Sequence, residues 1–184
     1  MFAHNVSDRT EITATGTDRV RLLHGLCTND VKSLAPDQGC EAFITSVQGK
    51  ILGHVLLQML PDRIVMDTVP GQGERLGKHL NKYVVTEDVT YTETTAERSL
   101  WLLAGEKLPE TLQQAGIELP AADVESRDIT CGEIPARLTR VALLGNNSFL
   151  LRVEQAHSAA IETWLAKLNI AIITHRDQLL GLRI

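Results

Sequence analysis

The chain carries two similar successions of predicted elements, one in each half, and this internal repetition limits the folds that it can adopt. In the first half, the alternating strand pattern ITATG precedes a helical pattern over residues 18–26. In the second half, the strand pattern SLWLLAG precedes an apolar helical stripe over residues 108–116. We therefore predict two related half-units, at about residues 1–95 and 96–184.

The remainder of each half repeats a strand followed by an amphipathic helix. Turn residues precede predicted strands at 63–68 and 148–153, and spaced apolar residues predict helices over 73–83 and 157–168. Another pair of strands is joined by a hairpin that turns at residues 48–50. Because such short connections pair strands antiparallel, the predicted fold class is α+β, built of duplicated half-units of antiparallel strands and helices.

The composition is that of a globular protein and argues against two classes of partner. The 43% of hydrophobic residues suffices for a packed core, while the net charge of −5 and the scattered Lys and Arg argue against a nucleic-acid surface. No apolar run approaches the roughly 20 residues that cross a bilayer, and the N-terminus has neither the basic start nor the apolar stretch of an export signal. We expect a cytoplasmic protein with no direct nucleic-acid or membrane partner.

The three cysteines, Cys27, Cys40 and Cys131, are odd in number and have no CxxC spacing. This pattern predicts buried reduced thiols rather than a disulfide framework or a zinc site. The sequence also has no HExxH, no glycine-rich phosphate loop and no GxSxG elbow, which argues against the usual zinc, nucleotide and hydrolase sites. We predict no metal site.

Two segments point to a family. The sequence HGLCTNDV at residues 24–31 and the sequence SVQGKILGH at 46–54 resemble the T-protein (aminomethyltransferase) of glycine cleavage and, more closely, the YgfZ-type folate-binding proteins. The stretches LNKYVVTEDV and the final LRI extend this resemblance to most of the chain. It implies the N-terminal folate-binding domain of that family, with tetrahydrofolate as the cofactor and a folate-type small molecule as the partner.

The resemblance draws attention to His54 as a catalytic candidate. The family's aminomethyltransferases carry a pair of aspartates where this chain has Gly53 and His54. A neutral imidazole can accept a proton near neutral pH, so His54 is a candidate general base, but it supplies no permanent negative charge beside a developing cation. The alternative is a half-buried strand histidine that is hydrogen-bonded to a neighbour.

Four further residues are candidates for folate binding. Asn29 and Asp30 belong to the TND signature, which the family resemblance places beside the central cavity, although short polar side chains also serve as turn caps. Arg140 is a candidate for pairing with the pterin edge or the glutamyl carboxylate of folate, and an exposed edge-strand arginine is the alternative. Thr68 stands near the position at which the glycine-cleavage enzymes usually carry an asparagine, and Leu143 near that of a tyrosine.

The last residues, RDQLLGLRI, resemble the family element in which an arginine is followed directly by a glutamate that grips the pterin. The sequence given ends at Ile184, before that glutamate and before the Lys-Gly-Cys-Tyr core of the YgfZ signature. We expect that the family's C-terminal region is lacking, and the sequence leaves open whether the chain is a truncated piece or a short natural protein.

Three functions remain open at this point. The first is a tetrahydrofolate-binding protein of the YgfZ branch, whose relatives have an accessory role in one-carbon or iron–sulfur metabolism, with iron–sulfur or tRNA-modification proteins as partners. The second is an aminomethyltransferase that passes a one-carbon unit to tetrahydrofolate, with His54 in place of the missing acid. The third is a degenerate domain that no longer binds folate and acts through protein contacts.

Overall fold

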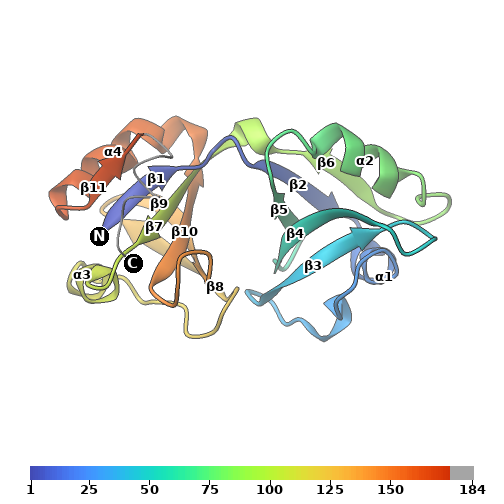
Figure 1. Cartoon of the computed structure of the whole chain (residues 1–184), viewed down its shortest axis with the longest axis horizontal. Helices are drawn as coiled ribbons and strands as arrows, with labels where there is room; N and C mark the ends of the chain where they lie inside the picture. The colour runs from blue at the N-terminus through green and yellow to red at the C-terminus, as the bar shows by residue number, and fades with distance from the viewer. Residues whose placement is uncertain (175–184) are drawn as a thin grey trace. The chain divides into compact units, whose positions relative to one another are not determined.

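The computed structural model describes residues 1–174, which form two compact α+β units (Figure 1). The first unit consists of residues 8–95, and the second unit consists of residues 1–7 together with the chain from residue 96 onward. The predicted α+β fold class with antiparallel strands is confirmed. The predicted C-terminal segment RDQLLGLRI lies outside the described residues.

The first unit is a five-stranded sheet in which every neighbouring pair of strands is antiparallel, with the strand order β3-β4-β5-β2-β6. Its elements are β2 (Thr10–Thr15), α1 (Arg19–His24), a 3₁₀ turn (Val31–Ser33), β3 (Gly39–Thr45), β4 (Ile51–Met59), β5 (Ile64–Thr68), α2 (Gly73–Asn81) and β6 (Thr90–Glu93). The strands turn their alternate apolar residues toward the two helices, so that Leu57 and Met66 pack with Leu76 and Leu80 of α2 in one buried cluster.

The second unit is a six-stranded sheet with the order β11-β1-β7-β10-β9-β8. Its elements are β1 (Phe2–Asn5), β7 (Arg98–Ala104), α3 (Leu108–Gln114), β8 (Ser126–Cys131), β9 (Ile134–Val141), β10 (Ser148–Glu154), α4 (Ser158–Lys167) and β11 (Ala171–Ile173), with 3₁₀ turns at Thr95–Glu97 and Gln155–His157. Trp101, Leu103 and Phe149 of the sheet pack with Ile161 and Leu165 of α4 in a second buried cluster. Each unit therefore has its own hydrophobic core.

The two units repeat one topology. The order of elements β2-α1-β3-β4-β5-α2-β6 in the first unit matches β7-α3-β8-β9-β10-α4-β11 in the second. The spatial order β3-β4-β5-β2 likewise matches β8-β9-β10-β7. The internal repetition that the sequence suggests is thus present as a repeated arrangement of strands and helices.

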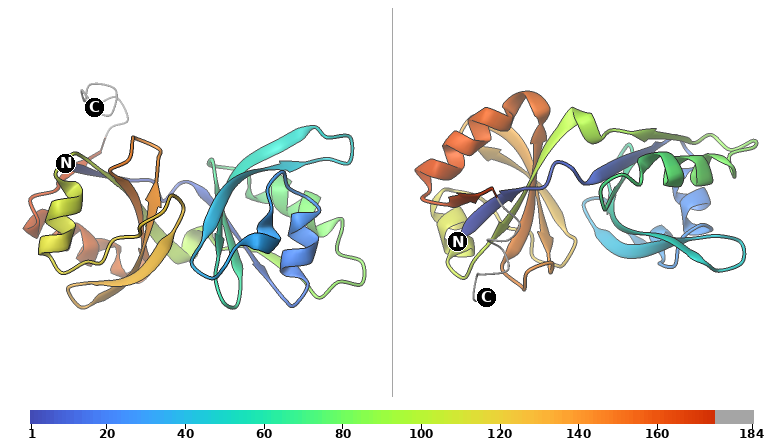
Figure 2. Two further views of the ribbon diagram at one scale, coloured as in Figure 1. Left: turned by 90° about the horizontal axis from the view of Figure 1, so that it is seen from below. Right: turned by 45° about the horizontal axis from the view of Figure 1, so that its top comes forward.

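The units exchange their leading strands. Strand β1 precedes β2 in the chain but pairs antiparallel with β7 of the second unit, whereas β6 precedes β7 but pairs antiparallel with β2 of the first. The chain consequently passes between the units twice, from β1 to β2 and from β6 to β7 (Figure 2). The predicted half-unit at about residues 1–95 differs from the observed first unit by residues 1–7, because strand pairing is decided by partners far away in the chain.

The turn between β3 and β4 and the length of the helices both bear on function. The predicted hairpin at residues 48–50 is present, with Gly49 at a φ of 75° and its amide donating to the carbonyl of Ser46 at 2.9 Å. Within residues 1–174, no helix has the length and hydropathy needed to cross a membrane.

Gly16, at the end of β2, is a second glycine whose conformation is demanding. Its φ is 97°, and a Cβ atom added there would lie 2.1 Å from the carbonyl oxygen of Asp88. Gly49 also has a positive φ, but an added Cβ would meet open space. The two positions therefore separate backbone strain from steric collision.

We predict that Gly16→Ala lowers the free energy of unfolding by about 3 kcal/mol, because it combines an unfavourable φ with a collision against backbone. The control Gly49→Ala should cost only about 1 kcal/mol, since it imposes the strain alone. Urea denaturation followed by circular dichroism measures both values. Equal losses in the two variants would contradict this account of Gly16.

Candidate functional site

The antiparallel pairing of β3 with β4 brings an acidic, an aromatic and an imidazole side chain together in the first unit. Phe43 lies opposite His54, and Glu41 lies two residues from Phe43 on the same face of β3, while Ala42 and Ile44 point into the core. Nε2 of His54 lies 2.9 Å from Oε2 of Glu41, and the rings of Phe43 and His54 are 5.3 Å apart. We call Glu41, Phe43 and His54 the imidazole cluster.

The imidazole cluster is accessible to a ligand, because the side chains of His54 and Glu41 are 41% and 52% exposed. A carboxylate that accepts a hydrogen bond from Nε2 leaves Nδ1 of the neutral imidazole as a proton acceptor. Phe43 adds an exposed aromatic face beside this pair. The arrangement can hold a flat ring with N–H donors and can move a proton.

The packing around residue 53, next to His54, explains why this position holds a glycine and not a carboxylate. This residue faces the core opposite Ile44, and a Cβ atom added there would lie 3.1 Å from the side chain of Leu76 in α2. A carboxylate at residue 53 would therefore enter the hydrophobic core, which is costly without a partner. Close packing of α2 on the sheet favours glycine at this position.

Thr68 and Asn29 are joined to the imidazole cluster through the backbone. The hydroxyl of Thr68, which is buried, donates to the carbonyl of His54 at 2.5 Å. Nδ2 of Asn29 donates to the carbonyl of Glu41 at 2.9 Å. The structure thus brings three predicted site residues, Asn29, His54 and Thr68, together around the paired strands β3 and β4. Asn29 and Thr68 donate hydrogen bonds to the backbone carbonyls of these strands.

The rest of the TND signature shapes a turn. The side-chain oxygen of Asn29 accepts from the amide of Asp30 at 2.8 Å, and the carboxylate of Asp30 accepts from the amide of Lys32 at 3.1 Å. Asp30 thereby caps the 3₁₀ turn, and it also lies 3.4 Å from Nδ1 of His24. The turn-forming alternative for Asn29 and Asp30 accounts for the two hydrogen bonds to the amides of Asp30 and Lys32.

Arg140 lies in the second unit, apart in the chain from the other four predicted residues. Its Nε donates to the carbonyl of Pro120 at 2.8 Å and its Nη1 to the carbonyl of Asn146 at 2.9 Å. The guanidinium also lies over the ring of Phe149, at 4.9 Å from its centroid. These contacts hold two loops to β9 and give Arg140 a structural role.

Glu41 is the site residue that sequence reasoning missed. Its signal was the alternation of exposed Glu41 and Phe43 with buried Ala42 and Ile44 beside a recognisable hairpin. The pairing of β3 with β4 shifts between Ile44 and Thr45, so counting back from the turn does not give the residue opposite His54. The irregularity in the strand decides which carboxylate reaches the imidazole.

The cysteines offer no ready nucleophile. Burial, with smaller contributions from the nearby Cys27 and Asp30, raises the pKa of Cys40 to about 11. Burial also raises the pKa of Cys27, and it raises the pKa of Cys131 to about 12. These thiols are therefore protonated near neutral pH. Separately, within residues 1–174 no three His, Cys, Asp or Glu side chains gather in a metal-binding group.

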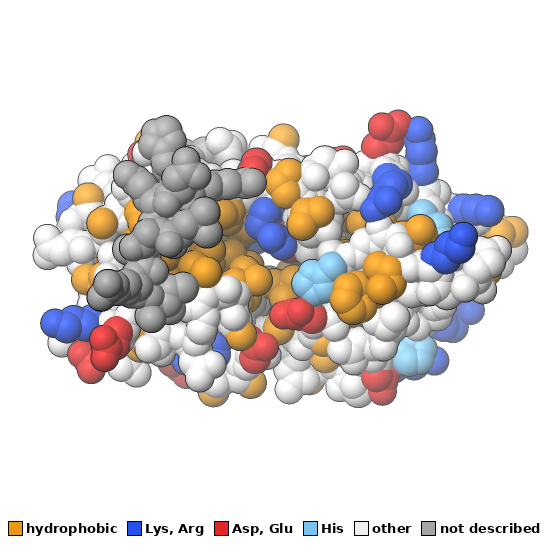
Figure 3. All heavy atoms as spheres, viewed as in Figure 1, with side chains coloured by type: hydrophobic (Ala, Val, Ile, Leu, Met, Phe, Trp, Pro, Cys, Tyr) orange, Lys and Arg blue, Asp and Glu red, His pale blue; other side chains and the backbone are white. Residues whose placement is uncertain are grey.

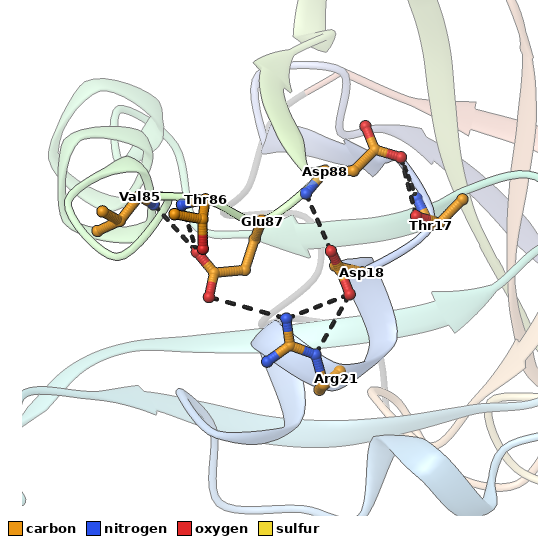
Figure 4. Close-up of polar contacts among 7 residues, drawn as sticks. All are labelled: Thr17, Asp18, Arg21, Val85, Thr86, Glu87 and Asp88. Atoms are coloured by element: carbon orange, nitrogen blue, oxygen red, sulfur yellow. Dashed lines mark hydrogen bonds and ion pairs between the residues drawn. The ribbon is translucent and has the colours of Figure 1, made fainter.

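The acidic residues of the TEDV motif also serve the structure (Figure 4). The carboxylate of Asp88 accepts from the amide and the hydroxyl of Thr17, both at 2.9 Å, while Asp18 accepts from the amide of Asp88 at 3.0 Å. Glu87 accepts from two amides of its own turn and lies 3.7 Å from Arg21 of α1. These hydrogen bonds lower the pKa values of both Glu87 and Asp88.

We predict that Asp88→Asn lowers stability at pH 7 and that its difference from the unaltered protein shrinks on acidification. The folded state lowers the pKa of Asp88, so the stabilisation is present above the unfolded pKa and is lost as pH falls through the folded one. Urea midpoints recorded between about pH 7 and pH 3 test this. Asp123→Asn, at an exposed carboxylate outside the network, is the control, and a pH-independent difference for Asp88→Asn would contradict the assignment.

Comparison with known proteins gives the family to which this chain belongs. Residues 3–169 match the family model described as the GCVT N-terminal domain. Because this match covers most of the chain, the protein belongs to the T-protein family and contains its N-terminal folate-binding domain. The resemblance to the T-protein family is confirmed.

Individual relatives agree with this assignment. A "Probable aminomethyltransferase" of Natronomonas pharaonis is 27% identical over 167 residues, which cover 88% of this chain and 46% of that protein. The crystal structure of glycine cleavage system aminomethyltransferase T from Bartonella henselae matches with a TM-score of 0.80 at 17% identity, covering 93% of this chain and 47% of that one. The chain thus spans about half the length of these two relatives.

The same fold occurs in a different assembly. Heterotetrameric sarcosine oxidase from Corynebacterium sp. U-96, in complex with pyrrole 2-carboxylate, matches with a TM-score of 0.66 at 16% identity. The match covers 90% of this chain and 82% of the matched chain. At this identity the likeness concerns the fold alone.

Proposed function

We propose that the chain is the reduced-folate-binding domain of a YgfZ-type protein that binds tetrahydrofolate without transferring an aminomethyl group. One observation carries this proposal: where aminomethyltransferases resemble this chain but have aspartates, Gly53 packs against Leu76 and His54 presents an imidazole. The site lies on the paired strands β3 and β4 and has an imidazole in place of a carboxylate. Binding is retained and transfer is disfavoured.

The residues of the imidazole cluster suit the chemistry of a reduced pterin. Its ring carries N–H donors that a carboxylate accepts well, and Glu41 supplies an exposed carboxylate. Phe43 supplies an apolar face, and His54 keeps one ring nitrogen as an acceptor. A mixed set of a few polar groups beside an aromatic surface is typical of small-molecule sites.

The biological role that follows from this proposal is accessory. A cytoplasmic protein that holds a reduced folate would support one-carbon or iron–sulfur metabolism through contacts with iron–sulfur or tRNA-modification proteins. The folate would act as a ligand whose presence those partners sense. Asn29, Asp30 and Thr68 would then contribute by fixing the backbone around the site, and Arg140 by holding two loops of the second unit.

A second function, aminomethyl transfer to tetrahydrofolate, is favoured by the pairing of His54 with Glu41 at 2.9 Å. In that case Nδ1 of His54 accepts the proton, and the carboxylate of Glu41 orients the ring and offsets the positive charge that the imidazole gains. Glu41 then replaces, from the adjacent strand, the charge that β4 lacks. This function depends on turnover rather than on binding alone.

We predict that tetrahydrofolate binds the chain in an isothermal titration under reducing, anaerobic conditions and that Glu41→Ala weakens this binding by about tenfold or more, as expected for a lost charged hydrogen bond. Glu162→Ala, at an exposed glutamate of α4 in the second unit, is the control and should bind as the unaltered protein does. A silent titration with folded protein would contradict folate binding and favour a degenerate interaction domain.

We also predict no formation of methylenetetrahydrofolate when the chain is incubated with tetrahydrofolate and an aminomethyl donor. The reason is the absence of a carboxylate on β4, which the exposed Glu41 replaces only from a neighbouring strand. Absorbance and chromatographic assays of the folate product measure the reaction. Turnover that disappears in His54→Ala and survives in Glu162→Ala would establish the second function instead.

A further inference from the structure

The hairpin that joins β3 and β4 ends in two aliphatic side chains that face solvent. Val47 is 76% exposed and Ile51 is 63% exposed, which places them among the most exposed large hydrophobic residues described. The turn between them is well ordered by hydrogen bonds, since the hydroxyl of Ser46 accepts from the amides of Gln48 and Lys50. A hydrogen-bonded turn thus presents apolar groups that contribute nothing to the core.

Helix α2 lies against the base of this hairpin and places basic side chains beside it. Arg75 donates to the carbonyl of Leu52, and Nε2 of His79 lies 3.0 Å from the carbonyl oxygen of Thr45. These two contacts reach both strands of the hairpin from one face of the helix. The position of α2 relative to the hairpin is therefore specified by side chains as well as by the core contact at Leu76.

The exposed charges of the hairpin turn (residues 46–52) and of α2 with its C-terminal cap are almost all positive. Lys50 of the turn and Arg75, Lys78 and Lys82 of α2 and its C-terminal cap are exposed, and Glu74, paired with Lys78 at 2.5 Å, is the acidic residue among them. Figure 3 shows Lys and Arg side chains gathering over α2 and the hairpin with apolar side chains beside them. This is notable in a chain whose net charge is −5.

We propose that the surface formed by Val47, Lys50, Ile51, Arg75, Lys78 and Lys82, here called the hairpin–helix surface, docks an acidic protein segment that also carries apolar side chains. The aliphatic pair supplies a small apolar centre and the cations form its rim, which is the usual arrangement of a protein interface. Complementary charge at the rim selects an acidic partner and speeds its association.

Other anionic partners fit this surface less well. A nucleic acid requires a longer track of cations and gains from exposed aromatic stacking groups, whereas the exposed apolar residues here are aliphatic. A membrane interface favours tryptophan and tyrosine at the point of contact, and neither residue occurs between residues 46 and 52. A small aliphatic centre of Val47 and Ile51, with separated cations around it, is better suited to an acidic protein segment that carries apolar side chains.

The test uses fluorescence anisotropy of a labelled peptide of about twelve residues built of Glu-Glu-Leu repeats, the acidic and apolar chemistry that the surface selects. We expect saturable binding to the full chain, at least tenfold weaker for the double variant Lys50→Glu/Lys82→Glu and severalfold weaker for Val47→Ser/Ile51→Ser. A peptide of Glu-Glu-Ser repeats should bind less tightly than the Glu-Glu-Leu peptide. Circular dichroism confirms that each variant is folded.

Matched controls separate this surface from general charge attraction. Lys32→Glu and Val69→Ser change an exposed lysine and an exposed valine of the first unit outside the surface, and they should leave peptide binding unchanged. Equal losses in the control variants, or no binding of the Glu-Glu-Leu peptide, would overturn the proposal. Tighter binding to oligodeoxythymidylate or to phosphatidylserine vesicles than to the peptide would overturn it in favour of those partners.

Discussion

The antiparallel register between β3 and β4 is the constraint on which the functional surfaces of the first unit depend. It places Phe43 opposite His54, brings the carboxylate of Glu41 to within 2.9 Å of the imidazole, and turns Gly53 inward toward α2. A shift of one residue would send His54 into the core and Gly53 to the surface, because side chains alternate between the faces of a strand. The same hairpin also presents Val47 and Ile51 to solvent at its end.

The exchange of leading strands gives the repeated topology its particular form. The second unit completes its sheet with β1, from the start of the chain, beside β7, while the strand that leads directly into β7, β6, pairs with β2 of the first unit. A second unit that began at residue 96 would therefore lose β1 and expose the edge of β7. The two repeats are therefore joined by the chain itself, which runs from β1 in the second unit to β2 in the first.

The chemistry of the imidazole cluster follows from what packing permits. Residue 53 faces Leu76, so the space that a carboxylate would need there is filled by the contact between α2 and the sheet. The polar group is instead the imidazole of His54 on the outer face, with its carboxylate supplied by β3. The inward-facing glycine and the outward-facing imidazole thus both follow from the packing of α2 on β4 and the pairing of β4 with β3.

Much of the fold could be read from the sequence. The period of the apolar residues predicted the helices at 73–83 and 157–168 and the hairpin at 48–50, and the structure has them at nearly those positions. The segment signatures also identified the family. These features are local, because helical and strand periods and turn residues are encoded within a few neighbouring positions.

The tertiary structure alone decided which residues meet. Sequence reasoning selected Asn29, Asp30, Thr68 and Arg140 as folate-binding candidates and His54 as the catalytic candidate, and the structure adds that the side chains of Asn29, Thr68 and Arg140 donate to backbone carbonyls. It also brought Glu41 to His54 across an irregular pair of strands and sent β1 to the second unit. Such pairings depend on register and on partners that are distant in the chain, so only the assembled sheets could specify them.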